Sequence, residues 1–136
     1  MQVFIIKLIM KDFIKNKLKE NLEKEKLDTS KIKIKTTVVN NLLVFLPFYD
    51  GERMGAFRLR PFNDDYKVFE TVLYDRFKGQ GLGKGMYKFI IKKLATEGKK
   101  LYSDDKQSQE AYNVWESLVR DGLATRLENN TFVSSI

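Results

Sequence analysis

The sequence predicts an α+β fold, in which a mostly antiparallel sheet with one parallel crossover is flanked by helices. Two observations lead to this prediction. Residues 31–73 contain four strand-like runs separated by turn signals; the first, Lys31–Val39, alternates apolar and polar side chains, and the second, Leu42–Tyr49, is apolar. A glycine-rich loop then leads into a helix, and a further strand, helix and hairpin follow. With 136 residues, 43% of them apolar, we expect a single domain over residues 1–136 with a sizeable core.

The N-terminal half is expected to contain one helix and four strands. Apolar residues recur every four positions from Ile6 to Leu22, which predicts an amphipathic helix over most of Phe4–Leu27. Pro47 suits an edge strand or a bulge. The expected strands are Lys31–Val39, Leu42–Tyr49, Arg53–Arg60 and Tyr66–Leu73. The turn signals between them are Asn40-Asn41, Asp50-Gly51 and Pro61–Asp65.

The C-terminal half is expected to contain two helices, a short strand and a hairpin. Ser108 can cap the second helix, and Gly122 can end it. The first helix is expected at Gly81–Gly98, with a core stripe of Leu82, Met86, Phe89, Ile90 and Leu94. The second has a stripe of Ala111, Val114, Trp115, Leu118 and Val119. The strands are expected at Lys100–Ser103, Ala124–Leu127 and Thr131–Ser135.

The glycine-rich loop has the sequence Lys78-Gly79-Gln80-Gly81-Leu82-Gly83-Lys84-Gly85. Glycines at alternate positions let a backbone approach a ligand closely. The start of a helix adds free N–H groups and a positive dipole end. The loop therefore predicts a cradle for a phosphate group, although its spacing fits neither the P-loop nor the dinucleotide fingerprint. The alternative is a glycine-rich turn that only caps the helix.

Positive charge is concentrated around this loop. The net charge of the chain is +7, and from Arg76 to Lys100 there are eight basic residues and one acid, Glu97. This excess suits a polyanionic ligand, while the alternative is a solvated helix face. Binding of nucleic acid stays open, but the chain lacks a stacking-aromatic motif of the RNA-binding type.

The chain has neither cysteine nor histidine. This excludes disulfides, zinc-thiolate sites and nucleophile–histidine dyads, so we expect no metal site. Any catalysis would rest on carboxylates, tyrosine, lysine, water or backbone donors. The apolar start, Met1–Met10, is too short to span a bilayer and lacks a cleavage site. We therefore expect a cytoplasmic protein without a membrane partner.

The loop and the order of elements resemble the GNAT superfamily of acyl-CoA N-acyltransferases. The stretch Lys78–Gly83 is similar to the family signature Arg/Gln-x-x-Gly-x-Gly/Ala, with lysine at its first position. Ser108, Ala111, Trp115 and Gly122-Leu123 are similar to the family pattern Asn-x-x-Ala-x-x-x-Tyr-x-x-x-Gly-Phe. The resemblance covers Leu42–Ile136 better than the first forty residues. Leu101–Asp104 with Trp115–Leu118 also looks like GNAT-like proteins of tailed phages.

The resemblance implies a GNAT-like sheet with a splayed parallel strand pair after the glycine loop, and acetyl-CoA as acyl donor. The pyrophosphate would sit on the N–H groups of Gly79 to Lys84, and a further phosphate would meet Lys84, Lys88 or Arg76. The pantetheine arm would lie between the splayed strands, where an N–H near Leu73 would polarise the acyl carbonyl. The residues implied to hold coenzyme A are Val72, Leu73, Lys78, Gly79, Gln80, Gly81, Leu82, Gly83, Lys84 and Ser108.

The resemblance also implies an acid and a base. Glu70 is the expected general base, directly or through water, and the alternative is an exposed strand glutamate. Trp115 stands where many family members have the tyrosine that reprotonates the thiolate, and an indole cannot do this. Tyr112, one turn earlier, could substitute, as could Tyr102 or water. For Trp115 itself we expect a place in the core.

Two functions therefore compete. The first is an acetyltransferase that moves an acetyl group from acetyl-CoA to an unidentified amine. The second is a catalytically inactive GNAT-fold binding or structural protein of phage origin. A nucleic-acid binder using the basic face is a weaker third. The chain is expected to be a monomer or a homodimer, since an edge hairpin such as Ala124–Ile136 is a common place for pairing.

Overall fold

The computed structural model of the protein describes residues 27–136. The helix expected over most of Phe4–Leu27 lies outside the described residues. In the N-terminal unit, which ends at Ser30, the Asp28 carboxylate accepts hydrogen bonds from the backbone N–H and the hydroxyl of Ser30. Residues Lys31–Ile136 form a second compact unit, which contains the sheet and both described α-helices. A single domain over residues 1–136 stays a prediction.

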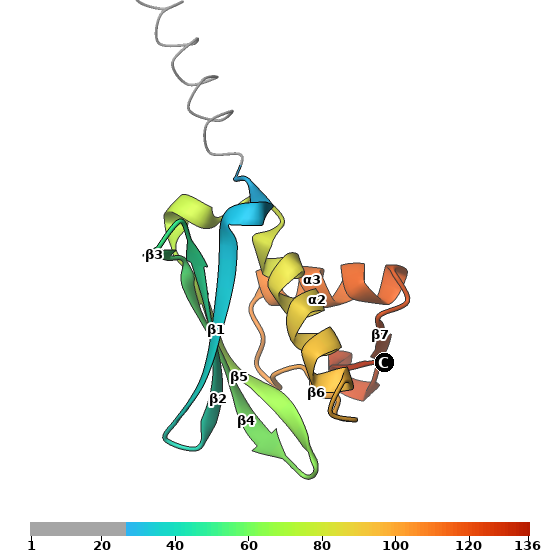
Figure 1. Ribbon diagram of the computed structural model, residues 1–136. Coiled ribbons are helices and arrows are strands. Elements are labelled where there is room, and N and C mark those ends of the chain that lie inside the picture. Colours follow the sequence, from blue (N-terminus) through green and yellow to red (C-terminus); the bar gives the residue numbers. More distant parts are fainter. Residues whose placement is uncertain (1–26) are drawn as a thin grey trace, which may run out of the picture. The chain divides into compact units, whose positions relative to one another are not determined.

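The second unit is built on a mixed, mostly antiparallel sheet of eight strands (Figure 1). The spatial order is β1-β2-β4-β5-β6-β8-β7, with β3 paired to β2, and only β5 and β6 are parallel among the described strands. The strands are β1 Ile32–Val39, β2 Leu42–Tyr49, β3 Glu52–Arg53, β4 Gly55–Phe62, β5 Asp65–Leu73, β6 Leu101–Tyr102, β7 Ala124–Arg126 and β8 Phe132–Ser134. The α+β class and the parallel crossover are confirmed.

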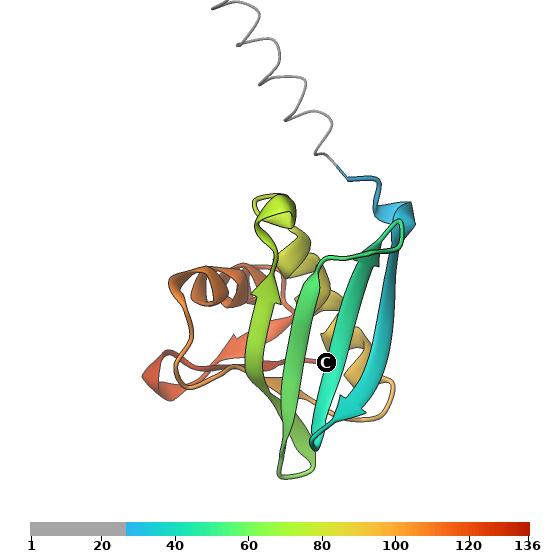
Figure 2. The same cartoon turned by 90° about the vertical axis from the view of Figure 1, so that its left-hand side faces the viewer.

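Two α-helices and three short 3-10 turns complete the described elements. They are η1 Thr29–Lys31, η2 Asp75–Phe77, α2 Leu82–Ala95, α3 Gln109–Arg120 and η3 Glu128–Asn130. Both α-helices lie on one side of the long strands β1, β2, β4 and β5 (Figure 1). Figure 2 shows the opposite face of these strands, which no α-helix of the described residues crosses. The core therefore forms between one face of the sheet and the two helices.

The first two hairpin turns are where the sequence predicts them. Asn40 and Asn41 have φ angles of 51° and 64°, which suits a two-residue turn that requires positive φ at both positions. The register of β1 and β2 follows directly, because Val39 pairs with Leu42. Asp50 and Gly51 also have positive φ, at the turn between β2 and β3.

The predicted strand Arg53–Arg60 is wrong in detail, because two strands replace it and β4 runs on to Phe62. The chain breaks at Met54, whose N–H donates to the Pro47 carbonyl over 2.8 Å. Pro47 lies in β2, an interior strand rather than an edge. Because proline has no N–H to contribute, the β2–β4 ladder ends before it, at the pair Phe45 and Phe57. Pro61 is not in a turn either, but pairs with Tyr66 inside the β4–β5 ladder.

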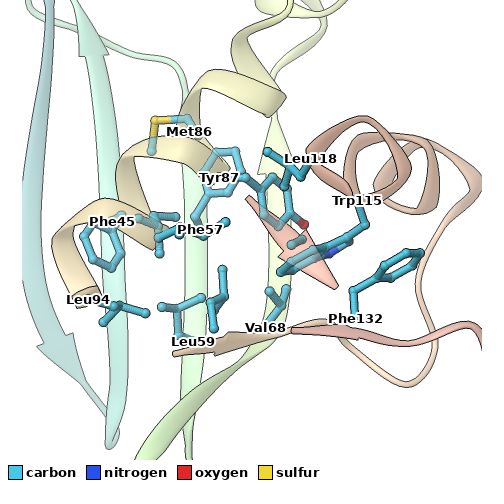
Figure 3. Close-up of a cluster of buried hydrophobic side chains, with 14 residues drawn as sticks. Phe45, Phe57, Leu59, Val68, Met86, Tyr87, Leu94, Trp115, Leu118 and Phe132 are labelled. Carbon is cyan, nitrogen blue, oxygen red and sulfur yellow. The ribbon is translucent and has the colours of Figure 1, made fainter. Parts of the chain in front are cut away.

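The core cluster joins side chains from the sheet to those of α2 and α3 (Figure 3). Trp115 is 1% exposed and stacks on Phe132 with ring centroids 5.8 Å apart, which confirms its expected place in the core. The predicted stripe of α2 is wrong at Phe89, whose side chain is 39% exposed. The helix buries Met86, Tyr87, Ile90, Ile91 and Leu94. At about 100° per residue this stripe is centred between Met86 and Tyr87, so Phe89 lies beyond its edge.

Candidate active-site cleft

A cleft of about 660 Å³ opens where β5 and β6 separate. The two parallel strands pair only at Tyr66 with Leu101 and at Lys67 with Tyr102, near the start of β5. The later part of β5, from Thr71 to Leu73, lines the cleft instead. Its lining residues are Phe57, Thr71, Val72, Leu73, Lys78, Gly79, Gly81, Leu82, Gly83, Lys84, Tyr87, Ser108, Glu110, Asn113 and Val114.

Of the ten residues expected to hold the pyrophosphate and the pantetheine arm, nine are among these lining residues. Gln80 belongs to the same loop but is not among the lining residues. The end of β5, the glycine loop and the start of α3 thus line the same cleft. Their role in binding stays a prediction at this point.

The glycine loop presents its backbone to the cleft. Gly79 and Gly81 have φ angles of 77° and 74°, a conformation that glycine adopts without steric cost. Gly81 is the N-cap of α2 and has no side chain with which to cap the helix. The first bond of the helix runs from the Gly85 N–H to the Gly81 carbonyl over 3.0 Å. The three N–H groups before it, those of residues 82–84, have no intrahelical partner and carry the positive end of the helix dipole.

Gly83 lines the cleft, and neither its backbone conformation nor its described neighbours require a glycine there. Its φ angle is not positive, and a Cβ atom built on it would meet no atom of residues 27–136 within 4 Å. Glycine inside a helix is also less favourable than most residues, by several tenths of a kcal/mol or more. The missing side chain keeps the N–H groups of the first turn open to the cleft. This arrangement fits a phosphate group that approaches the backbone.

The basic side chains around the loop are partly engaged by carboxylates. The Lys84 ammonium lies 2.6 Å from Asp121 Oδ2, and Lys88 lies 3.6 Å from the same oxygen. The hydrogen bond from Lys84 lowers the pKa of Asp121, and Lys88 acts in the same direction. Arg76 pairs with Glu52. Of the three cations expected to meet a further phosphate, Lys84 alone is among the cleft-lining residues.

The start of α3 forms the wall opposite β5. Ser108 is its N-cap, as predicted, and its hydroxyl accepts a hydrogen bond from the Ala111 N–H over 3.1 Å. This cap fixes the point at which the helix begins. Ser108, Glu110 and Asn113 thereby give this wall its polar groups.

The two residues predicted to be catalytic lie outside the cleft lining. Glu70 pairs with Arg58 over 2.9 Å, and its side chain is 52% exposed. It follows a bulge in β5, since Leu59 pairs with Val68 and Arg58 pairs with Glu70. The Tyr112 hydroxyl accepts a hydrogen bond of 2.8 Å from Arg126. The structure does not bring Glu70 and Tyr112 together, and the role of each stays a prediction.

Two hydroxyl-bearing residues of the cleft, Thr71 and Tyr87, are not among the site residues expected from the sequence. Alternation along β5 could have revealed Thr71, because it lies two residues before Leu73 and shares its face. Tyr87 belongs to the buried stripe of α2, and only the tertiary structure shows that it lines the cleft. Burial raises the pKa of its hydroxyl to about 12, against the opposing effect of a hydrogen bond with the Thr71 side chain.

Residues 27–136 contain no group of three or more histidine, cysteine, aspartate or glutamate side chains placed to hold a metal ion. No described helix combines the length and the apolar character needed to cross a membrane.

Neither a family model nor a curated protein matches the sequence of this chain, whereas solved structures match its fold. A GNAT family acetyltransferase from Elizabethkingia anophelis with acetyl-CoA bound has a TM-score of 0.58 and 15% identity, over 72% of this chain and 78% of the other. An IAA acetyltransferase from Bacillus cereus has a TM-score of 0.59 and 10% identity, over 77% and 99%. The ribosomal-protein-S18-alanine N-acetyltransferase from Escherichia coli has a TM-score of 0.51 and 21% identity, over 59% and 53%. The protein thus has the fold of the GNAT-family acetyltransferases.

Proposed function

We propose that this protein is an N-acetyltransferase that moves an acetyl group from acetyl-CoA to an amine. The observation that carries the proposal is the cleft itself. It joins a stretch of β5 that pairs with β4 but not with β6 to the N–H groups of a helix start, next to a lysine. A solved structure of the same fold has acetyl-CoA bound.

Coenzyme A fits the chemistry of this cleft. The volume of the cleft, about 660 Å³, is in the usual range for small-molecule sites. In the proposed complex, the N–H groups of residues 82–84 hold the pyrophosphate, and Lys84 leaves Asp121 for a phosphate oxygen. The edge of β5 from Thr71 to Leu73 offers backbone groups to the amides of the pantetheine arm, because β6 no longer pairs there.

The remaining roles follow the family resemblance. The amine must be neutral to attack, and Glu70 is the proposed base, acting through water from its position beside the β5 bulge. A backbone N–H near Leu73 is proposed to stabilise the charge that develops on the carbonyl oxygen. Tyr112 is the donor to the leaving thiolate that the resemblance implies, and its hydroxyl accepts a hydrogen bond from Arg126.

A second candidate is a protein that binds acyl-CoA without catalysis. Two observations favour it. Trp115 is 1% exposed at the position where the family resemblance places a tyrosine, and an indole N–H is no useful acid. Glu70, the proposed base, is held by Arg58. Binding of coenzyme A is common to both candidates, so turnover is the property that separates them.

The test has a binding part and a turnover part. Calorimetric titration with acetyl-CoA at low salt is expected to give a one-to-one complex of moderate affinity. Thiol release is then followed with a panel of amines that includes polyamines and lysine peptides. Gly81→Val, which places a side chain at φ 74° in the loop, is expected to abolish binding. Full binding by this variant would show that the cradle lies elsewhere, and binding without thiol release by the parent would favour the second candidate.

A further inference from the structure

Tyr87 is the one tyrosine among the residues that line the cleft. Tyr87 comes from α2. The family resemblance places the tyrosine that reprotonates the thiolate on the next helix, α3, where this chain has Trp115. The two side chains are in contact, with ring centroids 5.4 Å apart and planes at 68°. The phenol of Tyr87 therefore lies directly beside the ring that replaces the expected tyrosine (Figure 3).

The position of Tyr87 is fixed by packing. Its ring makes edge contacts with Phe57, at 6.1 Å, and with Trp115, and the residue is 3% exposed. Its hydroxyl meets the side chain of Thr71, which lines the cleft on β5. Two hydroxyl-bearing residues from α2 and β5 thus line the cleft, and Thr71 lies on the part of β5 that does not pair with β6. A group held by these contacts needs no reorganisation when a ligand arrives.

We propose that the Tyr87 hydroxyl donates a hydrogen bond to the sulfur of the departing coenzyme A thiolate. This inference rests on the proposed function. The nitrogen lone pair of the amine forms the new N–C bond, and the C–S bond breaks with its electron pair going to sulfur. The surplus proton of the amine leaves through the base and water. Tyr87 keeps its own proton throughout and shares it with the sulfur.

The surroundings of Tyr87 suit a permanent donor. Burial holds its pKa at about 12, so the phenol stays protonated over the whole range in which an amine acetyltransferase would work. The Thr71 side chain acts in the opposite direction and lowers this pKa, but burial has the larger effect. Tyr87 lines the cleft and therefore has a proton to share with a ligand bound there. Trp115, with its ring stacked on Phe132, has no comparable acidic group to offer.

The test measures the pKa of the thiol of coenzyme A bound to the protein, so it requires neither an acceptor amine nor turnover. The ultraviolet absorbance of the thiolate is titrated against pH, and a parallel titration with coenzyme A lacking its sulfur removes the absorbance of the protein. A hydrogen bond to a charged group contributes roughly 1.5–3 kcal/mol, which corresponds to about one to two pKa units. Tyr87→Phe is therefore expected to raise the pKa of the bound thiol by that amount, with little change in coenzyme A affinity.

Two matched variants make the outcome specific. Tyr66→Phe removes a hydroxyl from β5 outside the cleft lining and is expected to leave the thiol pKa unchanged. Tyr112→Phe tests the rival donor. If coenzyme A binds to both the parent and Tyr87→Phe and the pKa of its thiol is the same in the two, the inference is wrong and the proposed function still stands. A rise of the thiol pKa in Tyr112→Phe would likewise overturn the inference and leave the proposed function standing. Absence of coenzyme A binding to the parent would instead refute the proposed function, and the inference would fall with it.

Discussion

Replacing Gly83 by valine tests why a glycine stands in the first turn of α2. Gly83 is already helical, and a Cβ atom there would meet no atom of residues 27–136 within 4 Å, apart from its chain neighbours and the backbone of its own helix. Glycine costs about 1 kcal/mol in a helix and ordinary residues at most about 0.7. We therefore expect Gly83→Val to raise the free energy of unfolding slightly, by roughly 0.3 kcal/mol or more. On the free energy of unfolding alone, the valine variant would be preferred to the parent protein.

Binding of acetyl-CoA is expected to change in the opposite direction. The branched side chain would stand over the N–H groups that are proposed to hold the pyrophosphate. A hydrogen bond to a charged group contributes roughly 1.5–3 kcal/mol. Loss of one such bond weakens binding by about 10- to 150-fold, at 1.4 kcal/mol for each factor of ten. The dissociation constant from calorimetry and the unfolding curve in urea give both quantities on the same preparation.

Gly85→Val is the matched control. Gly85 lies two residues further along the same helix, and a Cβ atom there would likewise meet no atom of the described residues within 4 Å. It is not among the cleft-lining residues, so its substitution should change stability similarly and leave binding intact. If Gly83→Val bound acetyl-CoA as tightly as Gly85→Val does, the backbone of this turn would not be the phosphate site and the reasoning would be refuted.

Four further predictions concern other parts of the site and the core. Glu70→Gln should lower turnover by about a hundred- to ten-thousand-fold, if Glu70 is the base, with coenzyme A affinity unchanged by calorimetry; full turnover would remove it from the mechanism. Asp121→Asn frees Lys84 from its carboxylate partner and should tighten acetyl-CoA binding at low salt, with a gain that fades as salt is added, whereas weaker binding would contradict this role. Trp115→Ala should cost about 3–5 kcal/mol of unfolding free energy in a urea titration, because it empties the centre of the core; a loss below 1 kcal/mol would show that the core collapses around the gap. Tyr87 has a folded-state pKa of about 12 against an ordinary value of 10.0, so its neutral form contributes stability that is complete below pH 10 and is lost as the pH rises toward 12. Tyr87→Phe should show a shallower loss of stability across that window, and identical alkaline unfolding of both proteins would contradict this.

Local patterns were sufficient to predict most of the sheet. The turns at Asn40-Asn41 and Asp50-Gly51 were readable because both need positive φ, which few residues adopt. The split of one predicted strand at Met54 was not readable. It depends on pairing with Pro47 in another strand, and alternation within one segment carries no information about that contact. The core stripe of α2 is a similar case. Apolar side chains occur on more than one side of this helix, and its contacts with the rest of the fold decide that Tyr87 is buried and Phe89 is not.

The sequence predicts the coenzyme-binding part of the candidate site better than it predicts the surroundings of the catalytic candidates. The glycine loop and Ser108 could be predicted because helix starts have local rules for caps and backbone conformation. The partners of Glu70 and Tyr112 could not be predicted, because Arg58 in β4 and Arg126 in β7 belong to other elements of the fold. Tyr87 was missed for the same reason, because a tyrosine on a buried helix face looks like core until a cleft is seen beside it.

The central claim is that acetyl-CoA places its pyrophosphate on the backbone at the start of α2. Amide spectra of the 15N-labelled protein, recorded during a titration with acetyl-CoA, test this most directly. The account predicts large shifts for the amides of Gly81, Gly83 and Lys84, and none for Gly51 or Gly122, which lie outside the cleft lining. Spectra that remain unchanged at millimolar acetyl-CoA, or shifts confined to residues away from the glycine loop, would contradict it.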